Sequence, residues 1–386
     1  MNTNMKVFLI AFALLVVLCA GLFFVLRRQS LPSAKAGLTI GWMGPLTGDA
    51  APYGQAIRNG TTLALDESGN KIPNKSEPLA VYFEDDQAQP RLGRTVFKAL
   101  AARITVPLII QAAGSSVMLA NIPEAQARKI VYISPSCSSD KIKDGGDYIF
   151  RTWPSDSYQA DFLAPLVYSR FGYKKAAILY INNEYGEGLA SQFKHAFIKA
   201  GGTVVLSEPI QQSGTDFRAQ LLRARDLQPD VIFTPVHALE GGRLLRQARE
   251  LSMSQQFVAD AVLYSPDFLK AAGSAAEGML ISNLAWHQDS ASARLFSDSY
   301  KTKFGTAPDI YAAAGYDCTR VILESLRRAR SYDAESLKSA LYSIKNFEGV
   351  TGSITIDSKG EVRLPYELTK VKGEQFAPIA LGTSSH

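Results

Sequence analysis

Two patterns of apolar residues alternate along this chain from residue 37 onward. Short apolar runs are typical of buried strands: Leu79–Phe83, Val106–Gln111, Ile130–Ser134, Ala176–Ile181, Thr203–Ser207, Val231–Thr234 and Gln256–Ala259. Between them, apolar residues recur three or four positions apart, which predicts helices: Gln89–Ala102, Tyr158–Phe171, Glu187–Ala200, Phe217–Leu227 and Leu239–Leu251. Strands that alternate with helices indicate parallel sheets covered on both faces, where ligands sit beyond the carboxyl ends of the strands.

The first such unit is the stretch Gly37–Gly54, in which an apolar strand runs into a glycine-rich turn. A predicted helix, Gln55–Leu65, follows it. Glycines in the turn allow the backbone to come close to a bound molecule. We therefore expect this loop to form part of a ligand-binding lobe.

The length of 386 residues favours two or three domains. A first lobe boundary is expected at Phe150–Asp156, which shows neither the helical nor the strand spacing of apolar residues and contains a proline. A second boundary is expected at Gly278–His287. Helices are predicted at Ala291–Phe304 and Tyr311–Arg330. The alternating stretches beyond them suit antiparallel strands: Ser353–Asp357 and Tyr366–Val371.

The N-terminal segment differs from the rest, because Val7–Leu26 is an unbroken apolar run. It is long enough to span a bilayer, while Ala34–Ala36 offers a small-x-small cleavage site. An uncleaved anchor and a cleaved signal are equally compatible with it, and both send the remainder of the chain outward, to the periplasm or its equivalent. Arg27 and Arg28 argue mildly against that direction, and the bulky Leu18 argues against lipidation of Cys19.

Composition and motifs exclude several classes of function. The net charge is +5, but Lys and Arg are scattered without an aromatic stacking pattern, which argues against nucleic acid. Three cysteines are too few for a disulfide scaffold; free thiols are preferred to a Cys137–Cys318 bridge. The four histidines lack metal-ligand spacing, so we expect neither a metal nor a cofactor. Hydrolase, nucleotide-binding and metalloprotease motifs are absent, and the acidic run Glu84–Asp86 is interpreted as a solvated turn or a contact between lobes, so we expect no enzyme.

A set of short motifs, weak singly but specific in their order, carries a resemblance. They are Gly44–Gly48 with Tyr53–Gly54, Glu84–Asp86, Gly114–Ser116, Ile133–Ser138, Arg151–Thr152 with Ser155–Asp156, Tyr185–Gly188, Leu245–Ala248 and Ala276–Gly278. From about Leu38 to its C-terminus the chain resembles the type I periplasmic substrate-binding proteins of ABC importers, in particular the branched-chain amino-acid binding family. The resemblance implies two α/β lobes, each a mostly parallel sheet, joined by three crossover strands and closing on the ligand. The expected limits are 1–36 for the signal or anchor, 37–155 with 286–351 for the N-terminal lobe, and 156–285 with 352–386 for the C-terminal lobe.

The resemblance places a carboxylate site in two serine-containing loops. Each follows a strand and is expected to open a helix, whose free N–H groups attract anions. Ser115 and Ser138 would donate hydroxyls and Ser136 its backbone, although all three also fit plain helix caps. Ser116 and Cys137 belong to the same two loops and are included in the predicted site.

Further positions complete the implied pocket. Asp260 matches the acidic partner of a ligand ammonium, although a gapless match would put Ala261 there and a turn aspartate is the alternative. Tyr185 and Tyr53 would supply rings for cation–π contact or would merely pack the lobe interface. Trp42 is expected either at the cleft or in the core. Where the family often has an aromatic residue, this chain has Pro235–His237, which changes the shape of the implied pocket. Trp153 is expected to pack at the hinge.

The function implied is capture of a small zwitterion, a branched-chain or other aliphatic amino acid, by hinge closure. The partners implied are that small-molecule ligand and an ABC permease in the membrane, with the binding protein a monomer. The alternative is a membrane-tethered sensor or a binding protein for an amide, urea or another small solute.

Overall fold

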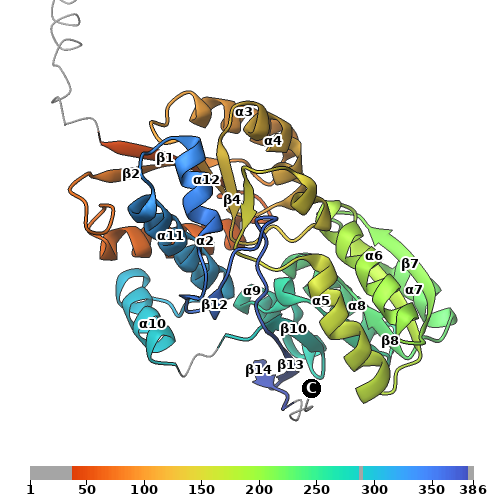
Figure 1. Ribbon diagram of the computed structural model, residues 1–386. Helices are drawn as coiled ribbons and strands as arrows, with labels where there is room; N and C mark the ends of the chain where they lie inside the picture. The colour runs from red at the N-terminus through yellow and green to blue at the C-terminus, as the bar shows by residue number, and fades with distance from the viewer. Residues whose placement is uncertain (1–36, 287–289, 381–386) are drawn as a thin grey trace, which may run out of the picture. The chain divides into compact units, whose positions relative to one another are not determined.

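The protein folds into two α/β lobes, each built on its own sheet (Figure 1). The structure is a computed structural model that describes residues 37–286 and 290–380. The predicted fold class is confirmed. The predicted signal or anchor segment lies outside the described residues, as does Cys19. Within the described ranges, no helix combines the length and the apolarity needed to cross a membrane.

The sheet of the first lobe has the strand order β2-β1-β3-β4-β5. Its strands are β1 Leu38–Gly44, β2 Leu79–Asp85, β3 Leu108–Gln111, β4 Val131–Ser134 and β5 Ile149–Arg151. The pairs β1–β3, β3–β4 and β4–β5 are parallel. Every residue of β3 and β4 is buried, because helices flank the sheet and leave no solvent-facing row.

The helices of the first lobe come from two separate parts of the chain. They are α2 Ala51–Glu67, α3 Pro90–Ala101, α4 Ser115–Ala127, α10 Ala291–Phe304, α11 Ile310–Arg328 and α12 Ala334–Tyr342. Helices α10 and α11 pack against α2, and α12 packs against α11 and β4. The last three helices therefore return to the first lobe after the chain has built the second.

The contact between α2 and α11 matters for the site, because it depends on two glycines. A Cβ at Gly60 would lie 2.0 Å from the carbonyl oxygen of Ala312, and one at Gly315 would lie 2.4 Å from that of Ile57. Only glycine permits so close an approach of the two backbones. The two helices therefore hold their first turns side by side.

The sheet of the second lobe has the order β14-β13-β10-β9-β8-β6-β7. Its strands are β6 Lys175–Ile181, β7 Thr203–Ile210, β8 Val231–Phe233, β9 Gln256–Ala259, β10 Leu280–Leu284, β13 Tyr366–Lys372 and β14 Gln375–Pro378. Its helices are α5 Asp156–Pro165, α6 Glu184–Lys199, α7 Arg218–Asp226, α8 Ala238–Glu250 and α9 Pro266–Ala272. Strands β6 to β10 pair in parallel, whereas β13 runs antiparallel to β10 and β14.

Two predicted elements differ from those observed. The antiparallel strand expected at Tyr366–Val371 is confirmed as β13, but only Ser353–Ile354 of the other forms a strand, β12, which pairs with β11 Phe347–Glu348. The helix expected at Tyr158–Phe171 is α-helical only to Pro165 and continues as a π-helical turn over Leu166–Arg170. Proline lacks the N–H that an unbroken α-helix would use, which accounts for the change.

The chain passes between the lobes three times, after β5, after β10 and before β13 (Figure 1). Residues following β12 still hydrogen-bond within the first lobe: the Ile356 N–H donates to the carbonyl of Ile344, and the Arg151 N–H donates to that of Gly360. We therefore propose that the third passage begins near residue 365, later than the limit of 352 expected from the sequence.

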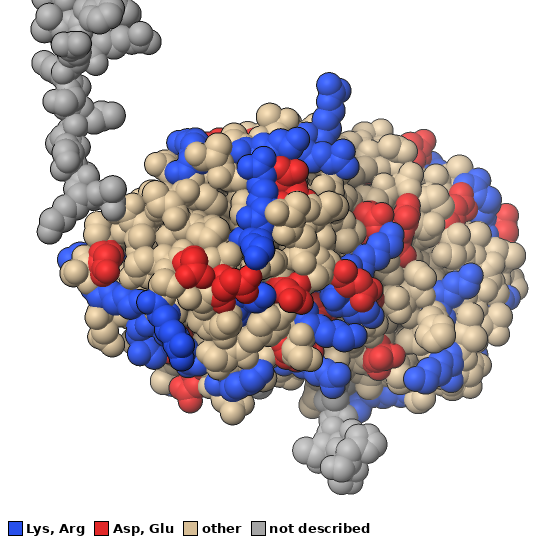
Figure 2. Space-filling view, turned by 45° about the horizontal axis from the view of Figure 1, so that its top comes forward, with Lys and Arg blue, Asp and Glu red and all other residues tan. Residues whose placement is uncertain are grey.

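Charged and reactive side chains occupy ordinary structural positions. Cys137 and Cys318 are buried free thiols, so the alternative of a bridge between them is wrong. Asp86 is fully buried and accepts a 2.8 Å hydrogen bond from Gln111, so the interpretation of the whole acidic run as solvated is wrong at this residue. On the face shown in Figure 2, basic and acidic side chains are interspersed, which weakens any potential of one sign over that face.

Candidate ligand-binding site

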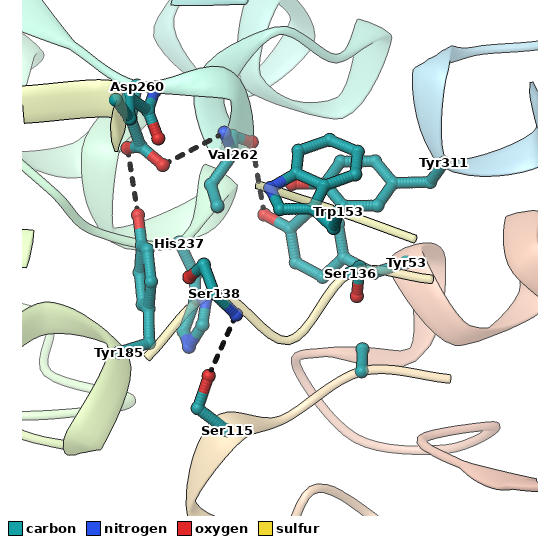
Figure 3. A pocket seen from close by; sticks show the side chains of 12 residues that line it. Tyr53, Ser115, Ser136, Ser138, Trp153, Tyr185, His237, Asp260, Val262 and Tyr311 are labelled. Carbon is teal, nitrogen blue, oxygen red and sulfur yellow. Dashed lines mark hydrogen bonds between the residues drawn. The ribbon is translucent and has the colours of Figure 1, made fainter. Parts of the chain in front are cut away.

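A cavity of about 60 Å³ lies between the two lobes. Its walls come from the carboxyl ends of strands in both sheets and from the first turns of helices, as the alternation of strands and helices predicts. Figure 3 shows its lining, which consists of Tyr53, Ala113, Ser115, Ser136, Ser138, Trp153, Gln159, Tyr185, His237, Asp260, Val262 and Tyr311. Six of the nine residues predicted for the site are among them.

The serine loops of the first lobe form one wall. Ser115 is the first residue of α4, and its hydroxyl oxygen accepts the backbone N–H groups of Ser138 at 3.3 Å and Ser139 at 3.4 Å. Because this oxygen accepts both bonds, its own proton remains available to donate. The hydroxyl of Ser136 donates to the carbonyl of Ala112 at 2.7 Å. The two loops are thus bonded to each other and present a preorganised polar edge.

The second loop departs from the prediction in one respect. No α-helix begins at Ser136–Ser138; a short 3₁₀ turn, Asp140–Asp144, follows instead, with Ser139 as its cap. The positive end of a full helix is therefore supplied by α4 alone, whose N-terminus carries Ser115. Backbone N–H groups of the second loop are already used within the loops, as those of Cys137 and Ser138 show.

Asp260 and Tyr185 form the opposite wall, in the second lobe. Asp260 follows β9 and is 2% exposed; its Oδ1 accepts the Tyr185 hydroxyl at 2.8 Å and its Oδ2 accepts the Val262 N–H at 3.4 Å. Burial raises the pKa of Asp260 to about 7, although both hydrogen bonds oppose the rise. A cation placed beside this carboxyl would favour its ionised form.

Aromatic rings close the rest of the cavity. Tyr53 lies in the first turn of α2 and Tyr311 in the first turn of α11, and their ring centroids are 5.0 Å apart in an edge-on arrangement. Trp153 stacks on Tyr311 with centroids 5.6 Å apart and planes 8° from parallel. Trp153 follows β5, where the chain first passes between the lobes, and it also lines the cavity, a position that the expected packing at the hinge does not include.

The aromatic residue that the sequence lacks after β8 is replaced by a histidine ring. His237 lines the cavity, and its ring stacks on Tyr185 with a centroid distance of 5.6 Å and an interplanar angle of 22°. The departure noted at Pro235–His237 therefore changes the chemistry of this wall but does not remove a ring from it.

Three predicted site residues lie elsewhere. Trp42 is fully buried in β1 and packs on Phe83 at 5.3 Å, so of the two alternatives the core position is the observed one. The Cys137 side chain belongs to the core beneath β4 and is 1% exposed. Ser116 points to the other lobe, where its hydroxyl oxygen accepts the Glu184 N–H at 3.3 Å. None of these side chains lines the cavity.

Several lining residues were not proposed from the sequence. Tyr311 and Gln159 sit on predicted helices, where their spacing is read as ordinary helix packing. Gln159 is fixed by a 2.7 Å hydrogen bond from its amide to the hydroxyl of Ser282. Ala113 and Val262 adjoin predicted residues and carry no chemical signal of their own. His237 stands out in the sequence as a departure from the family pattern, and its position in the loop after a predicted strand is the available signal.

The lobes are in contact across the cleft at several polar bonds. Besides Ser116, Lys141 pairs with Glu184 at 2.7 Å, and the Ser213 hydroxyl donates to Asp49. The Tyr53 hydroxyl accepts from the Ala238 N–H at 2.9 Å. The described arrangement is thus closed over the cavity. Among the described residues, no group of three or more His, Cys, Asp or Glu side chains is placed to hold a metal ion.

Known proteins share this architecture and about a quarter of the aligned residues. The profile of the family described as "Periplasmic binding protein" matches residues 37–375. The Leu/Ile/Val-binding protein BraC3 of Rhizobium johnstonii is 27% identical over 86% of this chain and 90% of its own length. The leucine-, isoleucine-, valine-, threonine- and alanine-binding protein of Pseudomonas aeruginosa is 26% identical, with 86% and 89% covered. The crystal structure of a leucine-binding protein, LivK, from Thermotoga maritima has a TM-score of 0.84 at 25% identity and covers 89% of this chain and 98% of its own.

The two-lobed fold and the closed cavity between the lobes define a solute-binding protein. The chain belongs to the periplasmic binding protein family, which the family match over nearly its whole described length establishes. Its relatives are binding proteins, so the expectation that it is not an enzyme is confirmed. The family is extracytoplasmic, as its description states.

Proposed function

We propose that this protein captures a small amino acid between its lobes and presents it to an ABC permease for import. One observation carries the proposal: Asp260, bonded to Tyr185, faces the serine loops across a single small cavity (Figure 3). An α-amino acid carries its ammonium and its carboxylate on the same carbon atom. A buried carboxyl on one wall and hydroxyl donors on the other match both groups.

The proposed pose assigns each end of the ligand to a different lobe. The carboxylate would accept the hydroxyl protons of Ser115 and Ser138, next to the N-terminus of α4, and Ser138 would give up its hydrogen bond to Asp156 to do so. The ammonium would lie against Asp260, with the rings of Tyr185 and Tyr53 nearby. The contacts from the second lobe exist only when the lobes are closed, so the closed form would bind the ligand more tightly than the open form. Ligand binding would favour closure by the difference between these two affinities.

Titration calorimetry against a panel of amino acids, amides, urea and simple carboxylates tests the ligand class. We expect heat from at least one amino acid, and no heat from any zwitterion would overturn the assignment. Asp260→Ala should weaken binding of an amino acid at least tenfold more than binding of its deaminated analogue. Equal losses for the two ligands would remove Asp260 from the site.

Export and delivery are the remaining parts of the proposal. Names of the relatives quoted above support an amino-acid ligand, since one protein is named for leucine, isoleucine and valine and the other for these three with threonine and alanine. We propose that the apolar N-terminal segment directs export of the chain and that the exported protein acts as a monomer. N-terminal sequencing of the mature protein distinguishes a cleaved signal from an anchor, and light scattering measures the oligomeric state. Uptake of labelled ligand by cells with and without the gene tests transport against the alternative of sensing.

A further inference from the structure

The imidazole of His237 forms part of the cavity wall and is not used by the pose described above. The residue is the N-cap of α8, in the loop after β8, and its ring is held between neighbouring rings, 5.6 Å from Tyr185 and 5.9 Å from Tyr53. Burial lowers the pKa of His237, although the charges of Glu240 and Asp49 oppose the change. The ring is therefore neutral near pH 7, with one nitrogen that donates and one that accepts.

Asn183 determines which nitrogen of His237 carries the proton. Its Oδ1 accepts the Gly186 N–H at 3.0 Å as the cap of α6, which fixes the amide orientation. The amide nitrogen Nδ2 therefore faces the other way, where it lies 3.4 Å from Nε2 of His237 and 3.4 Å from Oε1 of Gln212. An amide nitrogen only donates, so Nε2 of His237 accepts and its proton is on Nδ1.

The Nδ1–H group of His237 has no hydrogen-bond partner among the described residues, and its nitrogen is buried. Buried donors are nearly always paired, and an unpaired one costs free energy. In the proposed pose the serine hydroxyls serve the ligand carboxylate and Asp260 serves the ammonium. A third polar group on the ligand, an acceptor, is left to pair with Nδ1–H.

The cavity also limits the size of the ligand side chain. Its volume is small, about 60 Å³, and aromatic rings form much of its wall. A short side chain therefore fits more easily than the isobutyl group of leucine. The observations therefore call for a ligand that combines a short side chain with an oxygen acceptor.

We propose that this cavity selects small hydroxy amino acids, threonine or serine, over their aliphatic counterparts, because the side-chain hydroxyl oxygen accepts the Nδ1–H of His237. The selection rests on the amino-acid function proposed above. It concerns the part of the ligand that neither the serine loops nor Asp260 contact, and it makes His237 a specificity-determining residue.

Calorimetry with the full chain and two matched ligand pairs tests the inference. Threonine and valine are nearly equal in size and differ by a hydroxyl in place of a methyl, and serine differs from alanine by one hydroxyl. We expect threonine to bind at least tenfold more tightly than valine, and serine more tightly than alanine. Valine binding as tightly as threonine would overturn the inference and leave the amino-acid function intact, whereas no binding of any amino acid would overturn that function itself.

Two further measurements assign the effect to His237. His237→Phe keeps a ring against Tyr185 but removes the donor, so the preference for threonine should disappear or reverse. The matched control, His195→Phe, changes an exposed histidine on α6 and should keep the preference. Nitrogen-15 NMR of labelled histidines in the unaltered chain reads the tautomer without any substitution in the cavity, and a His237 ring protonated on Nε2 alone would contradict the proposal.

Discussion

The hydroxyl of Tyr53 accepts a 2.9 Å hydrogen bond from the backbone N–H of Ala238, across the cleft between the lobes. The same hydroxyl donates to the carbonyl of Val262 at 3.4 Å. Tyr53 belongs to α2 in the first lobe, whereas Ala238 begins α8 in the second. Burial raises the pKa of Tyr53 well above its usual range, so the phenol keeps the proton that it donates. One side chain thus joins both lobes at the rim of the cavity.

Removing this link should weaken ligand binding without disturbing either lobe. Tyr53→Phe deletes both hydrogen bonds of the closed form, each with a net contribution of about 1 kcal/mol, so we expect about thirtyfold weaker binding, mainly through faster dissociation. Calorimetry and stopped-flow fluorescence measure the two effects. Tyr300→Phe is the control, because its hydroxyl accepts from Asn59 within the first lobe. Equal affinities for Tyr53→Phe and the unaltered chain would show that the link does not contribute to closure.

Amino-acid affinity should depend on pH through Asp260. Burial raises the pKa of this carboxyl to about 7 in the ligand-free protein, while a ligand ammonium requires the carboxylate form. Affinity should therefore be constant above about pH 7 and fall by up to tenfold for each pH unit below it. Calorimetry between pH 5 and pH 8 measures the slope. Asp156 is also buried with a pKa raised to about 7, so Asp260→Asn is the needed comparison, and an unchanged slope in that variant would assign the titration elsewhere.

The same carboxyl should lower the stability of the ligand-free protein. Its folded pKa of about 7 lies above the unfolded value of 3.8, so the folded state binds more protons and loses stability as pH rises between these values. Asp260→Asn should accordingly raise the Tm by a few degrees at pH 8, and the gain should vanish near pH 4. Calorimetric melting at both pH values tests this. Asp226 is exposed, so Asp226→Asn should not change the Tm at either pH. A gain in Tm for Asp260→Asn that is independent of pH would show that the raised pKa of Asp260 is not its cause.

A buried ion pair should stabilise the second serine loop. The Arg151 side chain is fully buried and pairs with Glu361, while its Nη1 donates to the carbonyl of Ser139 at 3.0 Å and that of Cys137 at 3.4 Å. Glu361→Gln leaves the guanidinium without its counter-charge, and we expect a loss of about 3 kcal/mol in the free energy of unfolding.

Urea unfolding measures that loss, and calorimetry should show weaker ligand binding as well, since the loop lines the cavity. The matched control is Glu84→Gln, because Glu84 pairs with Arg103 at the surface. That substitution should cost less than about 0.5 kcal/mol. Similar losses in the two variants would mean that burial adds nothing to the Arg151–Glu361 pair.

Much of the fold could be predicted from the order of apolar runs. Strands β3 and β4 follow from four-residue stretches that are wholly apolar or nearly so, and β13 follows from its alternation. The end of α5 at Pro165 could not be predicted, because apolar residues keep their helical spacing beyond the proline. Packing decides which lobe helices α10 to α12 join, and the spacing of apolar residues along the chain does not encode that packing.

The candidate site divides in the same way. Ser115, Ser138 and Asp260 each follow a predicted strand, so their place at the carboxyl edges of the sheets follows from the sequence alone. Trp42 could not be placed, because β1 is apolar on both faces and such a strand does not show which way a side chain points. Its ring packs on Phe83 in the core.

The amino-acid sequence by itself determined the two-lobed class and the places of the serine loops and of Asp260 at strand ends, because each depends on local pattern and on strand direction. Only the tertiary structure decided which rings enclose the cavity. Tyr311 reaches Tyr53 because Gly60 and Gly315 let two helices distant in sequence approach closely. The free Nδ1–H of His237 likewise depends on the orientation of Asn183, a contact between residues 54 positions apart. Such contacts arise from packing between distant segments, and local sequence patterns do not record them.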